Sequence, residues 1–120
     1  MSVLALILVF LIAVLHVGIA WLEMFAWETR GPKVFTSLPA DLFKPTKVLA
    51  ANQGLYNGFL AAGLLWSLFI GDEGWQQCIA VFFLLCVAIA GGYGAMTVSK
   101  KILYVQAVPA FVALLLIFIL

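Results

Sequence analysis

Two ionisable side chains, His16 and Glu23, interrupt an apolar run that extends from Val3 to Trp27. A run this long and apolar predicts a helix that crosses a bilayer. Inside a bilayer an ionisable side chain is costly unless it faces a protein interior or a polar cavity, and so it indicates a functional site. Because an imidazole and a carboxyl can both exchange a proton with a bound molecule, we expect His16 and Glu23 to act as a catalytic acid and base.

Four more polar side chains, Asn52, Gln53, Tyr56 and Asn57, lie near the start of the second apolar segment. Asn52 and Tyr56 are four residues apart, as are Gln53 and Asn57, so each pair lies on one face of a helix. Counted from the same end of each span, Asn52 is level with Glu23. We therefore expect these four side chains to surround and orient a ligand beside the carboxyl group.

Three further candidates, Trp27, Tyr93 and Gln106, complete the predicted ligand-binding set. The ring faces of Trp27, Tyr56 and Tyr93 can hold a cationic group. All of these polar side chains fall between the middle of the bilayer and one of its faces, which predicts a cavity that opens to the cytoplasmic side. The alternative is that the amides only join helices by hydrogen bonds, and the sequence leaves that alternative open.

The overall composition excludes a soluble domain. Among 120 residues, 67% are hydrophobic and only 9% are charged, whereas soluble domains carry about 25% charged residues. A chain of this size has too little interior to hide that much apolar surface from water. The net charge of +1 and the lack of a basic stripe predict that the protein has no nucleic-acid partner.

No cofactor or metal site is expected. The chain has one histidine, His16, and it lies about 10.5 Å along a helix from Glu23, too far for both to bind one ion. Cys78 and Cys86 are eight residues apart within an apolar segment, a spacing that matches neither a redox motif nor a zinc site. Both thiols are predicted to be buried as small apolar side chains.

Polar stretches divide the chain into four apolar segments. These segments are residues 3–27, 48–70, 75–98 and 102–120. The second and third connections, Gly71–Gly74 and Ser99–Lys101, are short, so consecutive helices must be antiparallel neighbours. The sequence therefore predicts an all-α membrane protein, in which a single domain of residues 1–120 forms an antiparallel up-down four-helix transmembrane bundle. Pro109 is expected to kink the last helix.

The basic residues predict how the bundle is oriented. They occur only in the first and third connections, as Arg30, Lys33, Lys44, Lys47, Lys100 and Lys101. The second connection contains only the acidic Asp72 and Glu73. By the positive-inside rule, the first and third connections are expected to be cytoplasmic, with the N- and C-termini outside a bacterial cytoplasmic (inner) membrane.

Two stretches of the sequence are similar to a known family. The first is His16-x6-Glu23-Met24-Phe25-x-Trp27, and the second runs from Ala50 to Gly63 as AANQGLYNGFLAAG. They resemble an uncharacterised bacterial family of small four-span integral membrane proteins, catalogued as domain of unknown function thirteen hundred and four. The resemblance covers essentially the whole chain and implies the four-span topology, but it implies no reaction and no ligand.

Three functions remain open from the sequence. The first is the binding or transformation of a small amphipathic or lipid-like molecule in an intramembrane pocket. The second is proton-coupled transport of a small molecule, since small multidrug exporters are similar in length, in span number and in carrying one Glu in the first span. The third is an accessory or structural subunit whose polar cluster holds the helices in register. Membrane lipid is the expected partner, with a small amphipathic ligand and a homodimer as further options.

Overall fold

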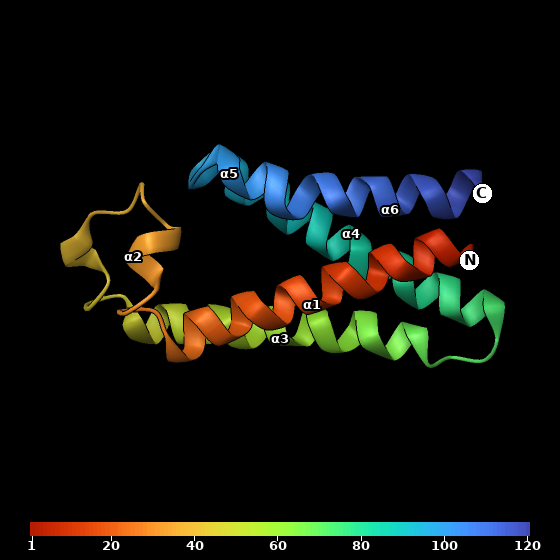
Figure 1. Ribbon diagram of the computed structural model, residues 1–120, viewed down its shortest axis with the longest axis horizontal. Helices are drawn as coiled ribbons and strands as arrows, with labels where there is room; N and C mark the ends of the chain where they lie inside the picture. Colours follow the sequence, from red (N-terminus) through yellow and green to blue (C-terminus); the bar gives the residue numbers. More distant parts are fainter.

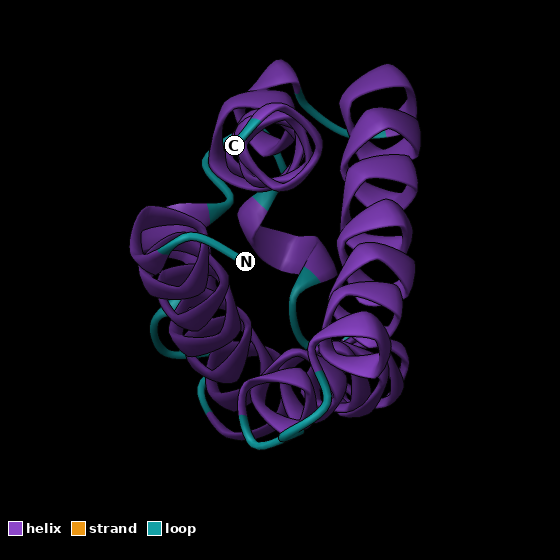
Figure 2. Cartoon of the chain, turned by 90° about the vertical axis from the view of Figure 1, so that its right-hand side faces the viewer, coloured by secondary structure: helices purple, strands orange, loops and turns teal.

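The computed structural model describes residues 1–120 and consists of helices joined by loops, with no strand (Figure 2). The long helices are α1 (Val3–Phe25), α3 (Lys47–Leu68), α4 (Glu73–Thr97) and a last helix built from α5 (Lys100–Ile102), the π-helical segment η2 (Leu103–Ala107) and α6 (Val108–Ile119). Two short helices, α2 (Gly31–Val34) and η1 (Ala40–Leu42), lie in the first connection. The prediction of an all-α fold is confirmed.

Short polar side chains cap the beginnings of α1 and α4. Ser2 Oγ accepts a hydrogen bond from the backbone N–H of Ala5 at 3.2 Å, and Asp72 Oδ2 accepts one from Trp75 at 2.9 Å. Such caps satisfy amide groups that the first turn of a helix leaves without partners. All four long helices begin and end within about two residues of the predicted segments, the accuracy usual for helix ends.

Three helices are long and apolar enough to cross a membrane, namely Val3–Phe25, Glu73–Thr97 and Lys100–Ile119. The helix α3 has 22 residues and so extends for about 33 Å, but it does not meet the same requirement for hydropathy. Its first half carries the amides Asn52, Gln53 and Asn57, which lower the average. Three of the four predicted spans therefore qualify by length and composition, and the fourth span stays a prediction.

The long helices run roughly along the longest dimension of a molecule that measures 47 × 24 × 17 Å (Figure 1). The helices α1 and α3 lie against each other, and both chain termini are at one end of the molecule with the turn between α3 and α4. The first connection and α5 are at the opposite end. All six basic residues belong to these two segments or to the first turn of α3, so we call this end the basic end.

The main hydrophobic core draws on all four long helices. It includes Val9 and Ile12 from α1, Leu64 from α3, Leu84 from α4 and Ile117 from α6. Along its length α4 contacts α3 as well as η2 and α6. Because α4 crosses from the α3 side of the molecule toward α5 (Figure 1), it separates from α3 toward the basic end.

The segment η2 is a wide helical turn immediately before Pro109. The N–H of Val108 donates to the carbonyl oxygen of Leu103, five residues earlier. Proline has no N–H and its ring displaces a carbonyl of the preceding turn, so a widened turn relieves the conflict. The α4 backbone passes close to this turn, because a Cβ atom built on Gly91 would lie 2.8 Å from the Ala107 nitrogen. Pro109 was expected to kink the last helix, and the structure shows a π-helical turn just before it.

Candidate functional site

The centre of the candidate site is the carboxyl group of Glu23, in the last two turns of α1. Its side chain is 1% exposed. Gln53 Nε2 donates to Glu23 Oε2, and Asn57 Nδ2 donates to Glu23 Oε1, both at 2.6 Å. Each carboxyl oxygen is therefore bound by one amide of α3, and these two amides are four residues apart on one face of that helix. The structure brings these three predicted residues together.

Close packing of α1 against α3 places the amides within reach of the carboxyl group. A Cβ atom built on Gly54 would lie 2.9 Å from Glu23 Cβ, 2.7 Å from Met24 Cγ and 3.0 Å from the carbonyl oxygen of Ala20. Any larger residue at position 54 would push the two backbones apart. Small residues permit this kind of approach between helices in membranes, and here the approach occurs between Gln53 and Asn57.

A cavity of about 730 Å³ lies beside the carboxyl group, between α1, α3, α4 and the start of the last helix. Ligand pockets usually occupy about 300–1,000 Å³. The predicted site residues on the wall of the cavity are Glu23, Gln53, Tyr56, Asn57, Tyr93 and Gln106. Its apolar wall includes Ile19, Leu22, Leu60 and Val105. Side chains from all four predicted segments therefore face one shared space.

The first connection forms the part of the cavity wall that sequence reasoning missed. Residues 34–37 line the cavity, together with Ser99 and Lys101. Lys101 Nζ donates to the carbonyl oxygen of Val34 at 3.0 Å, which joins the first connection to α5. No periodic pattern in the sequence could reveal this wall, because it depends on a loop folding back over the helices.

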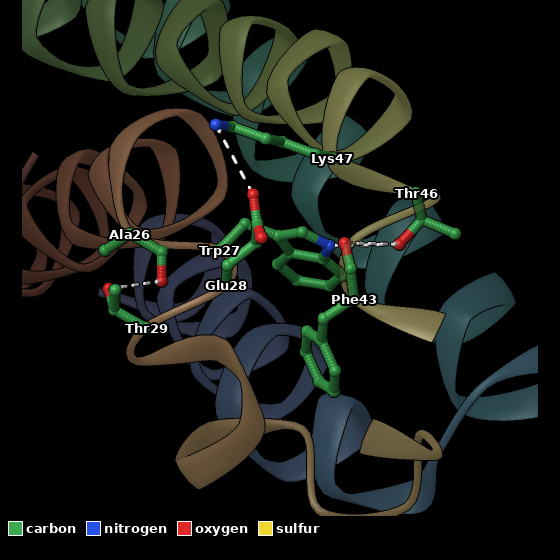
Figure 3. Close-up of polar contacts among 7 residues, drawn as sticks. All are labelled: Ala26, Trp27, Glu28, Thr29, Phe43, Thr46 and Lys47. Carbon is green, nitrogen blue, oxygen red and sulfur yellow. Dashed lines mark hydrogen bonds and ion pairs between the residues drawn. The ribbon is translucent and has the colours of Figure 1, made fainter. Parts of the chain in front are cut away.

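Trp27 lies outside the cavity and holds the first connection in place (Figure 3). Its Nε1 donates to Thr46 Oγ1 at 3.0 Å. Its ring packs against Phe43 at 4.9 Å and Phe35 at 5.3 Å between centroids. Because Phe35 itself lines the cavity, Trp27 shapes the wall from behind and has no surface there for a ligand.

A charged pair closes the base of the same connection. Lys47 Nζ lies 3.4 Å from Glu28 Oε1, between the end of α1 and the start of α3 (Figure 3). Both side chains are exposed, and exposed pairs contribute about 0–1 kcal/mol. The aromatic contacts, rather than this pair, must supply most of the local stability.

His16 is fully buried in α1 but does not line the cavity. Its Nδ1 donates to the carbonyl oxygen of Ile12 at 2.8 Å, and its Nε2 has no hydrogen-bond partner. Glu23 makes its hydrogen bonds with Gln53 and Asn57 instead. The action of His16 and Glu23 as an acid and base stays a prediction, and no hydrogen bond links the two side chains.

Asn52 is exposed, and its Nδ2 donates to the carbonyl oxygen of Val48 in its own helix at 2.9 Å. It therefore lies outside the cavity. Successive residues of a helix point in directions about 100° apart. Since α3 is rotated so that Gln53 faces Glu23, Asn52 points away from Glu23. Asn52 was a candidate because it lies at the same depth along α3 as Glu23 does along α1, but equal depth does not determine which face of α3 carries Asn52.

The two cysteines have different surroundings. Cys78 is exposed, so the prediction that both thiols are buried is wrong for this residue. Cys86 is half-buried and lies on the cavity wall. No three His, Cys, Asp or Glu side chains come together in this chain, and the groups on the cavity wall that could ligate a metal are the Glu23 carboxyl and the Cys86 thiol.

Comparison with known proteins identifies the family. The sequence profile described as Protein of unknown function (DUF1304) matches residues 10–118, so the chain belongs to that family. The chain is also similar to Uncharacterized protein YpaA of Lactococcus lactis subsp. lactis (strain IL1403), with 32% identity over 117 residues that cover 96% of this chain and 97% of YpaA. No solved structure matches the chain. Neither match gives a number of spans, so the comparisons show the family and do not show the four-span topology that the resemblance implied.

Proposed function

We propose that the protein is an integral membrane protein that binds a small amphipathic or lipid-like molecule in the cavity beside Glu23. The observation that carries the proposal is a carboxyl group, 1% exposed, on the wall of a cavity of about 730 Å³. Burying a carboxyl group away from water is costly unless its charge is paired or hydrogen-bonded. Interhelical hydrogen bonds in membrane proteins contribute on average only about 0.6 kcal/mol, so stability alone is a weak reason to keep it.

The hydrogen bonds of Glu23 leave room for a ligand. An ionised carboxyl group has about four acceptor positions, and the amides of Gln53 and Asn57 use one on each oxygen. A hydroxyl or ammonium group of a ligand would take one of the remaining positions. In this proposal the amides orient the carboxyl group, and Glu23 recognises the polar end of the ligand.

The rest of the cavity suits the apolar part of an amphipathic molecule. Leu60 of α3 and Ile19 and Val105 of the neighbouring helices give the cavity aliphatic surface. Tyr56 on α3 and Tyr93 on α4 line the cavity while remaining 60% and 68% exposed. Because these two side chains line the cavity and also reach the outer surface, they support a route by which a ligand enters the cavity between α3 and α4, from the side that would face the bilayer.

We also propose the complete topology that the sequence predicts. In this proposal α3 is the fourth span of an antiparallel bundle, and two of its amides, Gln53 and Asn57, are stabilised by the hydrogen bonds that they donate to Glu23. The concentration of all basic residues at one end of the molecule supports a cytoplasmic location for that end and for the cavity. Both termini would then lie outside a bacterial inner membrane.

The test is ligand-induced thermal stabilisation of the purified protein in detergent. The probes are hexadecylamine and monopalmitoylglycerol, which carry an ammonium group and hydroxyl groups on the same chain length. We expect at least one probe to raise the melting temperature of the wild-type protein. Glu23→Gln keeps the shape of the side chain but replaces one acceptor oxygen with a donor, so the stabilisation should disappear.

Glu28→Gln is the matched control, because Glu28 pairs with Lys47 outside the cavity. This variant should retain the stabilisation. Circular dichroism and gel filtration establish that each variant is folded before the probes are added. Equal stabilisation of the wild type and Glu23→Gln would contradict the proposal, as would a wild-type protein that neither probe stabilises.

Proton-coupled transport is the second candidate function. It is favoured by the single carboxyl group on the cavity wall, because such a group can bind either a proton or a cationic substrate. Transport by two cooperating protomers would agree with the homodimer that the sequence leaves open. Uptake of an aromatic cation into proteoliposomes under a pH gradient would distinguish this function, and a flux that persists in Glu23→Gln would exclude it.

A further inference from the structure

The cavity has a second charged group, which the proposed function does not use. Lys101 lies on the cavity wall, as do Ser99, Thr36 and Ser37. One hydrogen bond, from Nζ to the carbonyl oxygen of Val34 at 3.0 Å, holds its ammonium group at the point where the first connection meets α5. An ammonium group has three donors, so two remain for another partner.

The charge around Lys101 favours an anionic partner. The basic end carries six basic residues, and its connections contain only Glu28 and Asp41 as acidic residues. Glu28 is already paired with Lys47. Hydroxyl groups such as those of Thr36 and Ser37 are additional donors on the same stretch of wall. This region therefore presents hydrogen-bond donors and positive charge, whereas Glu23 presents acceptors.

We propose that the cavity is selective for a phospholipid whose headgroup carries both an anionic phosphate and a hydroxyl donor. The phosphate is bound by Lys101 and the neighbouring hydroxyl groups, and the headgroup hydroxyl donates to Glu23. The acyl chains leave the cavity between Tyr56 and Tyr93. This inference rests on the proposed function and names its ligand class.

The position of Glu23 along α1 agrees with headgroup binding. Glu23 is two residues from the end of α1 at Phe25, on the side of the first connection. Lys101 is likewise at the beginning of the last helix, at the same end of the molecule (Figure 1). Both groups thus lie near one face of the bilayer, at the depth where lipid headgroups begin.

The experiment measures binding of three short-chain lipids by native mass spectrometry of the detergent-solubilised protein. Dioctanoylphosphatidylglycerol has a phosphate and hydroxyl donors, dioctanoylphosphatidylcholine has a phosphate without a donor, and dioctanoylglycerol has a hydroxyl without a phosphate. We expect the phosphatidylglycerol to bind about tenfold more tightly than either of the others. Inorganic phosphate is the control ligand without acyl chains. At millimolar concentration it should not compete with phosphatidylglycerol for binding to the protein.

Two lysine variants assign the preference to one side chain. Lys101→Gln should reduce phosphatidylglycerol binding to the level of dioctanoylglycerol while leaving dioctanoylglycerol binding unchanged. Lys100→Gln is the matched control, since Lys100 is exposed like Lys101 but does not line the cavity, and this variant should keep the tenfold preference.

The outcomes separate this inference from the proposed function. A preference for phosphatidylglycerol that persists in Lys101→Gln, or that disappears equally in Lys100→Gln, would overturn the role of Lys101. Competition by inorganic phosphate alone would overturn the assignment to a lipid. In both cases loss of dioctanoylglycerol binding in Glu23→Gln would still support the proposed function. Retention of that binding in Glu23→Gln would contradict the proposed function and, with it, this inference.

Discussion

The substitution Gly54→Ala tests whether close helix packing builds the carboxyl site. The added Cβ atom would meet Met24 Cγ at 2.7 Å, Glu23 Cβ at 2.9 Å and the Ala20 carbonyl oxygen at 3.0 Å. The first of these atoms belongs to a flexible side chain and can move. The other two belong to the α1 backbone or sit directly on it, so α3 must shift away from α1.

The magnitude follows from two opposing terms. Overpacking in a well-packed interface costs about 1–3 kcal/mol, while replacing a mid-helix glycine with alanine gains about 0.5–1 kcal/mol. We therefore expect Gly54→Ala to lower the free energy of unfolding by about 0–2.5 kcal/mol. The shift also lengthens the hydrogen bonds from Gln53 and Asn57, so ligand binding at Glu23 should weaken.

Gly58→Ala is the matched control on the same helix. Its Cβ atom would find only Ala20 Cβ, at 3.9 Å, which is an ordinary contact. Only the helix-propensity term then applies, and the free energy of unfolding should rise by about 0.5–1 kcal/mol. Reversible unfolding in mixed micelles, followed by tryptophan fluorescence, measures both variants. Changes of the same sign and size at Gly54 and Gly58 would refute the packing argument.

Two further predictions concern the neighbouring contacts. Gly91→Ala should change the free energy of unfolding by the same two terms as Gly54→Ala, a net loss of about 0–2.5 kcal/mol, because its Cβ atom would lie 2.8 Å from the Ala107 nitrogen. Gly92→Ala has nothing within 4 Å of its Cβ atom, so it should raise the free energy of unfolding by about 0.5–1 kcal/mol. Equal melting temperatures of the two variants would contradict this account of the π-helical turn. Trp27→Phe removes the hydrogen bond to Thr46, so we expect a loss of about 0.5–1.5 kcal/mol. Limited proteolysis should detect faster cleavage of the first connection in Trp27→Phe, and an unchanged rate would contradict the role of that hydrogen bond.

The sequence was most informative where chemistry and helical periodicity coincide. An apolar run with one carboxyl group predicts both a buried helix and a nearby polar partner, and amides four residues apart predict one helix face. These arguments led to Glu23, Gln53 and Asn57, which the structure joins by hydrogen bonds. They could not establish that α3 is apolar enough to be a span, because the same amides reduce its hydropathy.

Features that depend on tertiary contacts escaped the sequence argument. Asn52 was selected by depth, but the rotation of α3 that serves Gln53 directs it outward. Trp27 was expected at the ligand, but it packs against Phe43 in the first connection. The contribution of Lys101 to the cavity wall depends on how the connection folds over the helices, and no local pattern encodes that.

Photolabelling tests the central claim, that the cavity beside Glu23 holds an amphipathic molecule, most directly. A monoacylglycerol with a diazirine in its acyl chain would be irradiated with the protein in nanodiscs, and the labelled peptides mapped by mass spectrometry. We predict labels on the cavity wall at Leu60 and Cys86, which excess unlabelled monoacylglycerol removes and Glu23→Gln abolishes. Labels spread over outward-facing residues such as Trp66 and Phe118, equally strong in Glu23→Gln, would contradict the claim.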